Sequence, residues 1–326
     1  MLSEKLLQFF PTPKFLNIPC AGVSISDSFV RMIQFENDSG GKLKIKKYAE
    51  KSLPIGAIVA GRLNNREEII HTLESLRKET GIENIRVSIP EEKAYLFETT
   101  IPLVQSKDIR DTIEFKIEEN VPLPTSDVLF DYVLLQDTKI TDHLDVVVSA
   151  LPSKFVDIYM DLIHSAGLKV YSMEVESQTI ARSLLSKDQN GAYVILHFGA
   201  QKASIYIVYN RVVRFTSTTY LSEGWENDLS DIVSDTQKVI NYWQTNKNYN
   251  NENKTNNSIA KILVCGDGFS ESICSQLSSF LKIEVVLSDV WRNAFDIKEV
   301  VPKISFMDSL RYASAVGLAL PPEYLI

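Results

Sequence analysis

The residues best placed for chemistry lie in three polar turns, each of which directly follows a predicted strand. Two of these turns belong to hairpins of matched design, one over residues 24–28 and the other over 198–202. The third is Gly266–Phe269, which follows the apolar strand Lys261–Cys265 and opens a predicted helix. Backbone amides of such turns can wrap phosphate groups, and helix-opening glycines let the backbone approach a sugar and base. The three turns together predict a nucleoside triphosphate site between two lobes.

The strands that carry these turns form a duplicated pattern. We expect one three-stranded meander within Gly22–Ala49 and a second within Ala192–Ser217. Between them, residues 95–166 follow the order strand, helix, strand, strand, helix, which is enough to bury a small core. The sequence therefore predicts an α/β protein of two similar lobes with a subdomain inserted into the first. The predicted segments are an N-terminal lead (1–16), the first lobe (17–90 and 167–188), the insertion (91–166), the second lobe (189–220 and 258–326), and a helix with an Asn-rich loop on that lobe (221–257).

Helical periodicity marks the segments that cover these strands. Apolar residues recur at helical spacing in each, and Gly81 is expected to end the first. The predicted helices span 66–79, 106–119, 153–166, 177–185, 225–244, 270–280 and 307–320.

Composition excludes several classes of protein. The 326 residues carry 34 Lys and Arg against 42 Asp and Glu, so the net charge of -8 argues against nucleic acid as a partner. Three scattered cysteines, Cys20, Cys265 and Cys274, without metal-ligand spacing, indicate a reducing cytosol and no structural zinc. No segment has the length of apolar sequence that crosses a bilayer, so we expect a soluble protein.

The three turns also resemble the phosphate and adenosine loops of the actin-like ATPase superfamily. Gly22–Arg31 is similar to GxDIGSSSVK, with Ser24 where the family has Asp and Ser26 where it has Gly. His197–Lys202 is similar to the second loop, DIGA followed by small hydroxyl residues, and Gly266–Phe269 to a glycine-rich adenosine turn. The closing segment Ala313–Ala319 resembles the A-x-x-I-G-L-A pattern of the last helix.

A further motif inside the insertion points to one branch of that superfamily. Ile117–Pro124, followed by Asp131 and Tyr132, resembles the E-x-x-I-P-F-P and D-Y signature of the type IV pilus assembly protein PilM family, which is related to the cell-division protein FtsA. The resemblance covers the chain from about Pro19 to Leu320. It implies an actin-like, ribonuclease H-like fold of two duplicated lobes with an insertion in the first.

The resemblance also implies a site for ATP and Mg²⁺, but two expected aspartates are replaced. Ser24 and His197 cannot supply the hard anionic contacts that magnesium prefers, while Arg31 keeps a positive charge where the family has Lys. We therefore expect weak or vestigial ATP binding, hydrolysis that is very slow or absent, and no enzymatic role; Asp27 or Asp267 could partly substitute as a metal contact. The residues implied for the nucleotide are Ser24, Ser26, Asp27, Ser28, Arg31, His197, Gly199, Ala200, Gln201, Lys202, Gly266, Asp267, Gly268 and Phe269.

His197 has two interpretations. At the end of a strand beside the cleft it could contact phosphate or act as a pH-sensitive donor. A hydrogen-bonded structural histidine is the interpretation we favour.

The partner implied by the resemblance is a PilN-like inner-membrane protein. Its short cytoplasmic N-terminal peptide would enter a groove between the first lobe and the insertion, as an extended strand with apolar side chains in pockets. Ile117, Val121, Pro122 and Leu123 would contribute to this groove, or would instead be packing residues that orient the insertion. The protein would then be a cytoplasmic scaffold at the inner face of the membrane, in a machine for pili, secretion or DNA uptake; self-association into a homo-oligomer stays open.

Two alternatives come from other classes. An active ATP-hydrolysing enzyme of the actin-like and sugar-kinase superfamily needs acidic residues at the cleft, and Ser24 with His197 argue against it. An FtsA-like, membrane-tethered filament of cell division needs a basic amphipathic C-terminal helix, and residues 320–326, LPPEYLI, do not form one.

Overall fold

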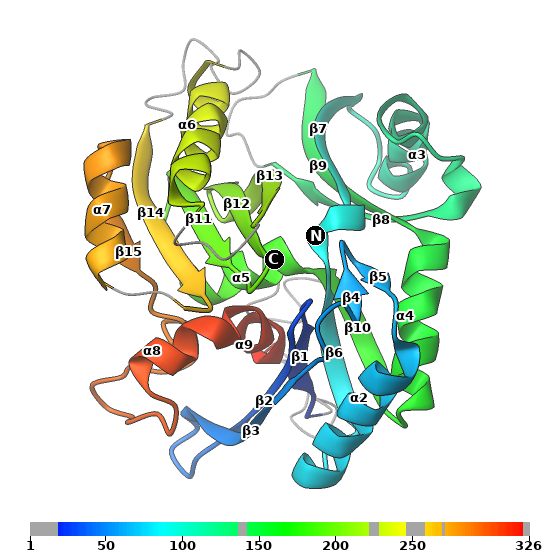
Figure 1. Ribbon diagram of the computed structural model, residues 1–326. Helices are drawn as coiled ribbons and strands as arrows, with labels where there is room; N and C mark the ends of the chain where they lie inside the picture. The colour runs from blue at the N-terminus through cyan, green and yellow to red at the C-terminus, as the bar shows by residue number, and fades with distance from the viewer. Residues whose placement is uncertain (1–18, 136–141, 222–227, 246–257, 269–270, 322–326) are drawn as a thin grey trace.

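Two five-stranded sheets of the same topology form the two lobes of the protein (Figure 1). The computed structural model describes residues 19–135, 142–221, 228–245, 258–268 and 271–321. The first sheet has the order β10-β6-β1-β2-β3 and the second the order β13-β12-β11-β14-β15. The strands of the first are β1 (Ala21–Ile25), β2 (Phe29–Asn37), β3 (Leu43–Ser52), β6 (Asn84–Ile89) and β10 (Lys169–Val175). Those of the second are β11 (Ala192–Phe198), β12 (Lys202–Tyr209), β13 (Val212–Tyr220), β14 (Ile259–Gly266) and β15 (Val285–Leu287).

The register of the strands shows how closely the two lobes repeat each other. In each lobe the first three strands pair antiparallel, and the first, fourth and fifth pair parallel. Ser24 lies opposite Arg31, one position before the last pair of its hairpin, and His197 lies opposite Ser204 at the same place in the other hairpin. The predicted duplication is confirmed, and Ser24 and His197 are its equivalent positions.

The insertion is a three-stranded antiparallel sheet covered on one face by a helix. Its strands are β7 (Tyr95–Pro102), β9 (His143–Pro152) and β8 (Val128–Leu134), in that order. Ile109, Ile113 and Ile117 recur every four residues on α3 (Ile109–Asn120) and pack against the alternate residues Val146 and Val148 of β9. Helical and strand periodicities therefore build a separate small core here, as the sequence predicts.

Two helices cover the outer face of the first sheet. α2 (Arg66–Thr80) begins after Asn65, whose side chain accepts from the Glu68 amide, and ends at Gly81 in the left-handed conformation. α4 (Ser153–Ser165) continues the chain after β9, and its Leu162 and Ile163 belong to the core of the first lobe. From the sequence we assigned α4 to the insertion, residues 91–166. The buried Leu162 and Ile163 of α4 instead pack in the core of the first lobe.

The remaining helices cover the second sheet or lie between the lobes (Figure 1). The predicted helix 307–320 is wrong as one helix, because a 3₁₀ turn over Leu310–Tyr312 separates α8 from α9. α6 and α7 pack on the second sheet, while α5 and α9 pack in a core shared by both lobes. Their bounds are α5 (Glu176–Leu184), α6 (Leu229–Thr245), α7 (Glu271–Leu281), α8 (Phe306–Ser309) and α9 (Ala313–Ala319); the short hairpin β4 (Ile58–Val59) and β5 (Arg62–Leu63) was not predicted.

None of the helices that the structure describes combines the length and apolar character of a membrane span. The predicted N-terminal lead and Asn-rich loop lie outside the described residues.

α9 approaches both β1 and α5 so closely that each contact requires a glycine. A Cβ added at Gly22 would lie 1.9 Å from the Ala315 carbonyl oxygen, and one added at Gly317 would lie 1.8 Å from the Thr179 carbonyl oxygen. Real Cβ atoms do not approach backbone so closely, so these two glycines let α9 join the first sheet to the helix between the lobes.

Replacing Gly22 tests this packing. We expect Gly22→Ala to lower the free energy of unfolding by about 3 kcal/mol or more, since neither β1 nor α9 can yield without losing its own hydrogen bonds. Gly40→Ala, in an exposed turn where the new Cβ meets only the end of the Asp38 side chain, should stay within about 0.5 kcal/mol of wild type. Urea unfolding followed by circular dichroism measures both, and equal midpoints for the two variants would contradict the close-packing argument.

Candidate functional site

The three predicted turns meet in the cleft between the lobes. Ser26, Asp27, Gln201 and Lys202 line one small cavity there, so the two hairpin turns face each other. The third turn joins them through Asp267, whose carboxylate accepts from the Arg31 guanidinium at 2.6 Å. The sequence-based prediction that these turns converge is therefore correct.

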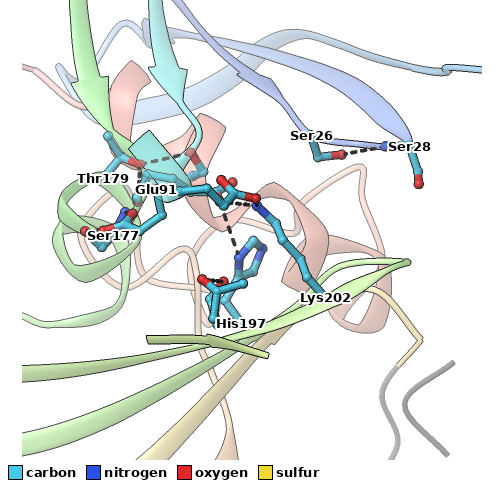
Figure 2. A network of polar contacts seen from close by, with 12 residues as sticks. Ser26, Ser28, Glu91, Ser177, Thr179, His197 and Lys202 are labelled. Atoms are coloured by element: carbon cyan, nitrogen blue, oxygen red, sulfur yellow. Dashed lines mark hydrogen bonds and ion pairs between the residues drawn. The ribbon is translucent and has the colours of Figure 1, made fainter. Parts of the chain in front are cut away.

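Lys202 crosses the cleft from the second lobe into an acidic environment of the first. Its ammonium lies 2.8 Å from Glu92 Oε1 and 3.9 Å from Glu176 Oε2, and the three side chains are each only 6–8% exposed. Burial disfavours the ammonium charge, but Glu176 and Glu92 outweigh that effect and raise the pKa of Lys202. Figure 2 shows the Lys202 side chain directed from its strand toward the segment that carries Glu91. The Lys202 charge is thus neutralised within the protein.

Arg31 makes the corresponding contact in the opposite direction. This buried residue of β2 donates to Glu50 on the neighbouring β3 and to Asp267 at the end of the second lobe's β14. Arg311 lies 3.7 Å from both of these carboxylates. The positive charge expected to face a phosphate is therefore paired with two carboxylates.

His197 is neutral in this environment. Burial, reinforced by the Lys202 charge, lowers the pKa of its imidazole to about 4. Its Nδ1 atom lies 3.8 Å from Glu176 Oε2 and is buried without a hydrogen-bond partner. A neutral ring cannot act as a cationic phosphate contact, so the structure favours a structural histidine, although its Nδ1 atom has no hydrogen-bond partner.

Polar groups of the two hairpin turns form hydrogen bonds within their own turns. Ser26 Oγ accepts from the Phe29 amide at 3.0 Å, and Gly199 donates its N–H to the Lys202 carbonyl at 2.8 Å. A Cβ at Gly266 would lie 2.0 Å from the Phe198 carbonyl oxygen, so this glycine is required by strand packing. Of the other predicted nucleotide residues, Ser24 is buried, Ser28 is half-buried, Ala200 is exposed, Gly268 is left-handed and Phe269 lies outside the described residues.

Glu91, Glu92 and Glu176 are site residues that our sequence analysis missed. Glu91 and Glu92 follow the parallel strand β6, and Glu176 follows the parallel strand β10. The carboxyl ends of adjacent parallel strands lie at one edge of a sheet. Acidic residues that follow two such strands could therefore have predicted an acidic cluster at this edge. Two hydrogen bonds fix the position of the Glu91 carboxylate, which accepts from the Ser177 amide at 2.9 Å and from the Ser177 hydroxyl at 2.6 Å (Figure 2).

These residues do not fit Mg-ATP. The cavity that the two hairpin turns line measures about 40 Å³, whereas ligand pockets typically measure about 300–1,000 Å³. The Asp27, Glu92 and Glu176 carboxylates act on the Lys202 charge, so a triphosphate near Lys202 would meet carboxylates. Burial raises the pKa of Asp27, and its Oδ1 atom lacks a hydrogen-bond partner. Within the part of the chain that the structure describes, Asp27 is not grouped with other metal-ligating side chains as a cation site.

A larger groove lies between the insertion, the first lobe and the edge of the second. It measures about 700 Å³. The strands β8 and β10, each at the open edge of its own sheet, both line it. Val147, Ser149 and Leu151 occupy alternate positions of β9. They lie on the face of the sheet that α3 does not cover, and this face lines the groove. The other lining residues are Ile89, 129–133, Val156, Met160, 170–175, Gln178, Arg182 and 211–213.

The comparison with protein families agrees with this architecture. The sequence model of the family described as "Type IV pilus assembly protein PilM" matches residues 22–221, which is most of the chain. The chain belongs to the PilM family. The actin-like fold class predicted from the sequence is also confirmed.

Solved structures resemble this PilM-family chain over nearly its whole length. The structure described as a PilM-PilN type IV pilus biogenesis complex matches with a TM-score of 0.76 and 15% identity, over 93% of this chain and 98% of the other. The ethanolamine utilization protein EutJ from Carboxydothermus hydrogenoformans matches with a TM-score of 0.49 and 12% identity, over 95% and 90%. The cytoplasmic domain of EpsL, an inner membrane component of the type II secretion system of Vibrio cholerae, matches with 0.46 and 9%, over 90% and 92%.

Our expectation for the groove residues of this PilM-family protein needs a correction. Ile117 and Val121 are buried in the core of the insertion, and Leu123 packs partly against that core. Pro122 is exposed, and none of the four lines the groove. Their periodicity on and after α3 directs the apolar side chains to β9, so the packing alternative holds for Ile117, Val121 and Leu123. Asp131 and Tyr132 of the same family signature do line the groove.

Glu91 gives this protein a specific dependence of stability on pH. Burial raises the pKa of Glu91 from 4.5 to about 7, although the Ser177 hydrogen bonds oppose this. The folded state therefore holds the proton more tightly than the unfolded chain, and stability falls as pH rises from about 4.5 to about 7. Glu91→Gln keeps an acceptor and a donor for Ser177 but does not titrate. Relative to wild type, we expect it to gain up to about 3 kcal/mol over this interval, as measured by urea unfolding at several pH values. Parallel pH profiles would contradict the assignment.

Proposed function

We propose that this PilM-family protein is a scaffold of a type IV pilus machine, or of a related secretion or DNA-uptake machine. Its groove would bind the cytoplasmic N-terminal peptide of a PilN-like inner-membrane protein, which would hold it at the inner face of the membrane. The observation that carries this proposal is the groove of about 700 Å³ between two open strand edges. The match to a solved PilM-PilN complex supports the identity of the partner.

The two strand edges define the form of ligand that fits. The outer edges of β8 and β10 carry backbone N–H and C=O groups that no strand of the described residues pairs with. An extended peptide placed between them would satisfy such groups and gain affinity from main-chain hydrogen bonds. A helix cannot do this, because its backbone groups are already paired within it.

The lining of the groove defines the side chains that such a peptide should carry. Apolar side chains predominate, including Val156 and Met160 on α4 and Val147 on β9. The Arg182 guanidinium within the groove is already paired with Glu174 and donates to the Gly317 carbonyl. A peptide with alternating apolar residues would therefore bury them against this lining.

We also propose that the protein acts without catalysis. The turns that would hold a nucleotide carry paired charges and a neutral histidine, so none of their described residues activates water or stabilises a phosphoryl transition state. These paired charges disfavour the alternative of an active ATP-hydrolysing enzyme. The binding role rests on the groove and does not require turnover.

A charge placed in the groove tests the proposed binding. Met160→Glu puts a carboxylate against the apolar lining, and we expect it to weaken binding of the partner's N-terminal peptide at least about tenfold. Ile158→Glu is a matched control, since Ile158 lies on the same helix, is 44% exposed and does not line the groove. Fluorescence anisotropy with a labelled peptide measures both. Equal affinities for the two variants would exclude this groove, and absence of saturable binding by wild type would exclude the proposed partner.

A backbone test distinguishes strand addition from side-chain docking alone. A peptide that is N-methylated at one position has no backbone N–H to donate at that position. Along a strand, successive N–H groups point alternately to the neighbouring strand on one side and to the one on the other. We expect every methylated position between the edges of β8 and β10 to weaken binding, because both neighbours are open edges. Insensitivity to methylation along the whole peptide would contradict strand addition.

A further inference from the structure

The contacts across the interlobe cleft are reciprocal. The second lobe sends Lys202 to Glu92 and Glu176 of the first lobe, and the first lobe sends Arg31 to Asp267 of the second. Lys202 and Arg31 are both buried. Each lobe therefore supplies one buried cation to carboxylates that belong to the other.

These ion pairs stand where the fold would otherwise hold a nucleotide. Lys202 is the first residue after the second hairpin turn, Arg31 lies just after the first, and Asp267 is the middle of the glycine turn. The two cations at this place are neutralised. The cavity that the two hairpin turns line beside Lys202 measures about 40 Å³, the size of one or two water molecules.

A nucleotide could enter only by breaking these pairs. Lys202 turned toward a phosphate would leave Glu92 and Glu176 buried without their counter-ion, which is unfavourable for a charge removed from water. Arg31 turned the same way would leave Asp267 with only the more distant Arg311, at 3.7 Å, and the Asp267 carboxylate would then face the incoming polyanion. The acids that hold the lobes together would also repel the ligand.

We propose that the interlobe cleft is closed by the chain's own ion pairs, Lys202 with Glu92 and Glu176 and Arg31 with Asp267, and takes no adenine nucleotide. The ion pairs hold the two lobes together, as a Mg-nucleotide bound between them would otherwise do. This inference concerns the cleft alone and does not depend on the proposed peptide groove. It replaces the weak or vestigial ATP binding expected from the sequence with none.

The first experiment asks whether wild-type protein binds nucleotide. Thermal unfolding and isothermal titration are run with millimolar ATP or ADP, each with and without Mg²⁺. We expect no heat of binding and no change in the unfolding midpoint. Binding with a Kd of about 10 µM would raise the midpoint by several degrees at that concentration. Saturable binding of either nucleotide would overturn the proposal, whatever the result of any peptide experiment.

The second experiment asks whether the ion pairs hold the lobes. Lys202→Met should lower the unfolding midpoint by several degrees and increase hydrogen exchange in both hairpin turns, and adding Glu92→Gln should restore part of the loss. Lys238→Met is the control, because Lys238 is exposed on α6 and, among the described residues, pairs with Asp235 of the same helix and lobe. An effect of Lys202→Met no larger than that of Lys238→Met would overturn the proposed closure. If Lys202→Met does not fold, Lys202→Arg and Glu92→Gln alone give the same comparison.

Discussion

A buried ammonium group between two lobes is the constraint on which much of this structure depends. Lys202 can keep its charge there only because Glu92 and Glu176 arrive at the same point. They do so because β6 and β10 run parallel and end at the same edge of the first sheet. Sheet topology in one lobe thus provides the counter-ions for a residue of the other, and the duplicated arrangement of the lobes brings the two together.

α5 carries this constraint from the cleft to the groove. Its first residue, Glu176, contacts Lys202, while Gln178 and Arg182 farther along line the groove. Between them, the Thr179 hydroxyl lies 2.9 Å from that of Ser314 on α9, and Gly317 lets α9 approach the backbone of α5. A short helix fixed at the cleft and along α9 has little freedom to rotate. The groove wall that it forms with β10 is therefore set by the same contacts that close the lobes.

Sequence reasoning predicted the repeated lobes, the insertion and the meeting of the turns, because each is encoded locally. Polar turns after apolar strands, and the spacing of Ile109, Ile113 and Ile117, are visible in short windows of sequence. It did not predict the partners of Lys202, because Glu92 is 110 residues away and their contact depends on how two lobes close. It also assigned Ile117 and Val121 to a groove. A motif marks where a family differs from its relatives, but only packing decides which side chains are covered.

The insertion is held at both of its ends, which explains why an open groove can persist beside it. On one side α4 places Leu162 and Ile163 in the core of the first lobe. On the other, the Arg214 guanidinium of β13 donates to both oxygens of Glu98 on β7, at 2.9 and 2.7 Å, in a largely buried pair. Such bidentate pairs fix orientation as well as distance. With both ends fixed, the insertion cannot close onto the first lobe, and the groove that β8 and β10 line stays open. The apolar side chains that line the groove are then not packed against one another across it. An extended peptide can therefore enter the groove with little rearrangement.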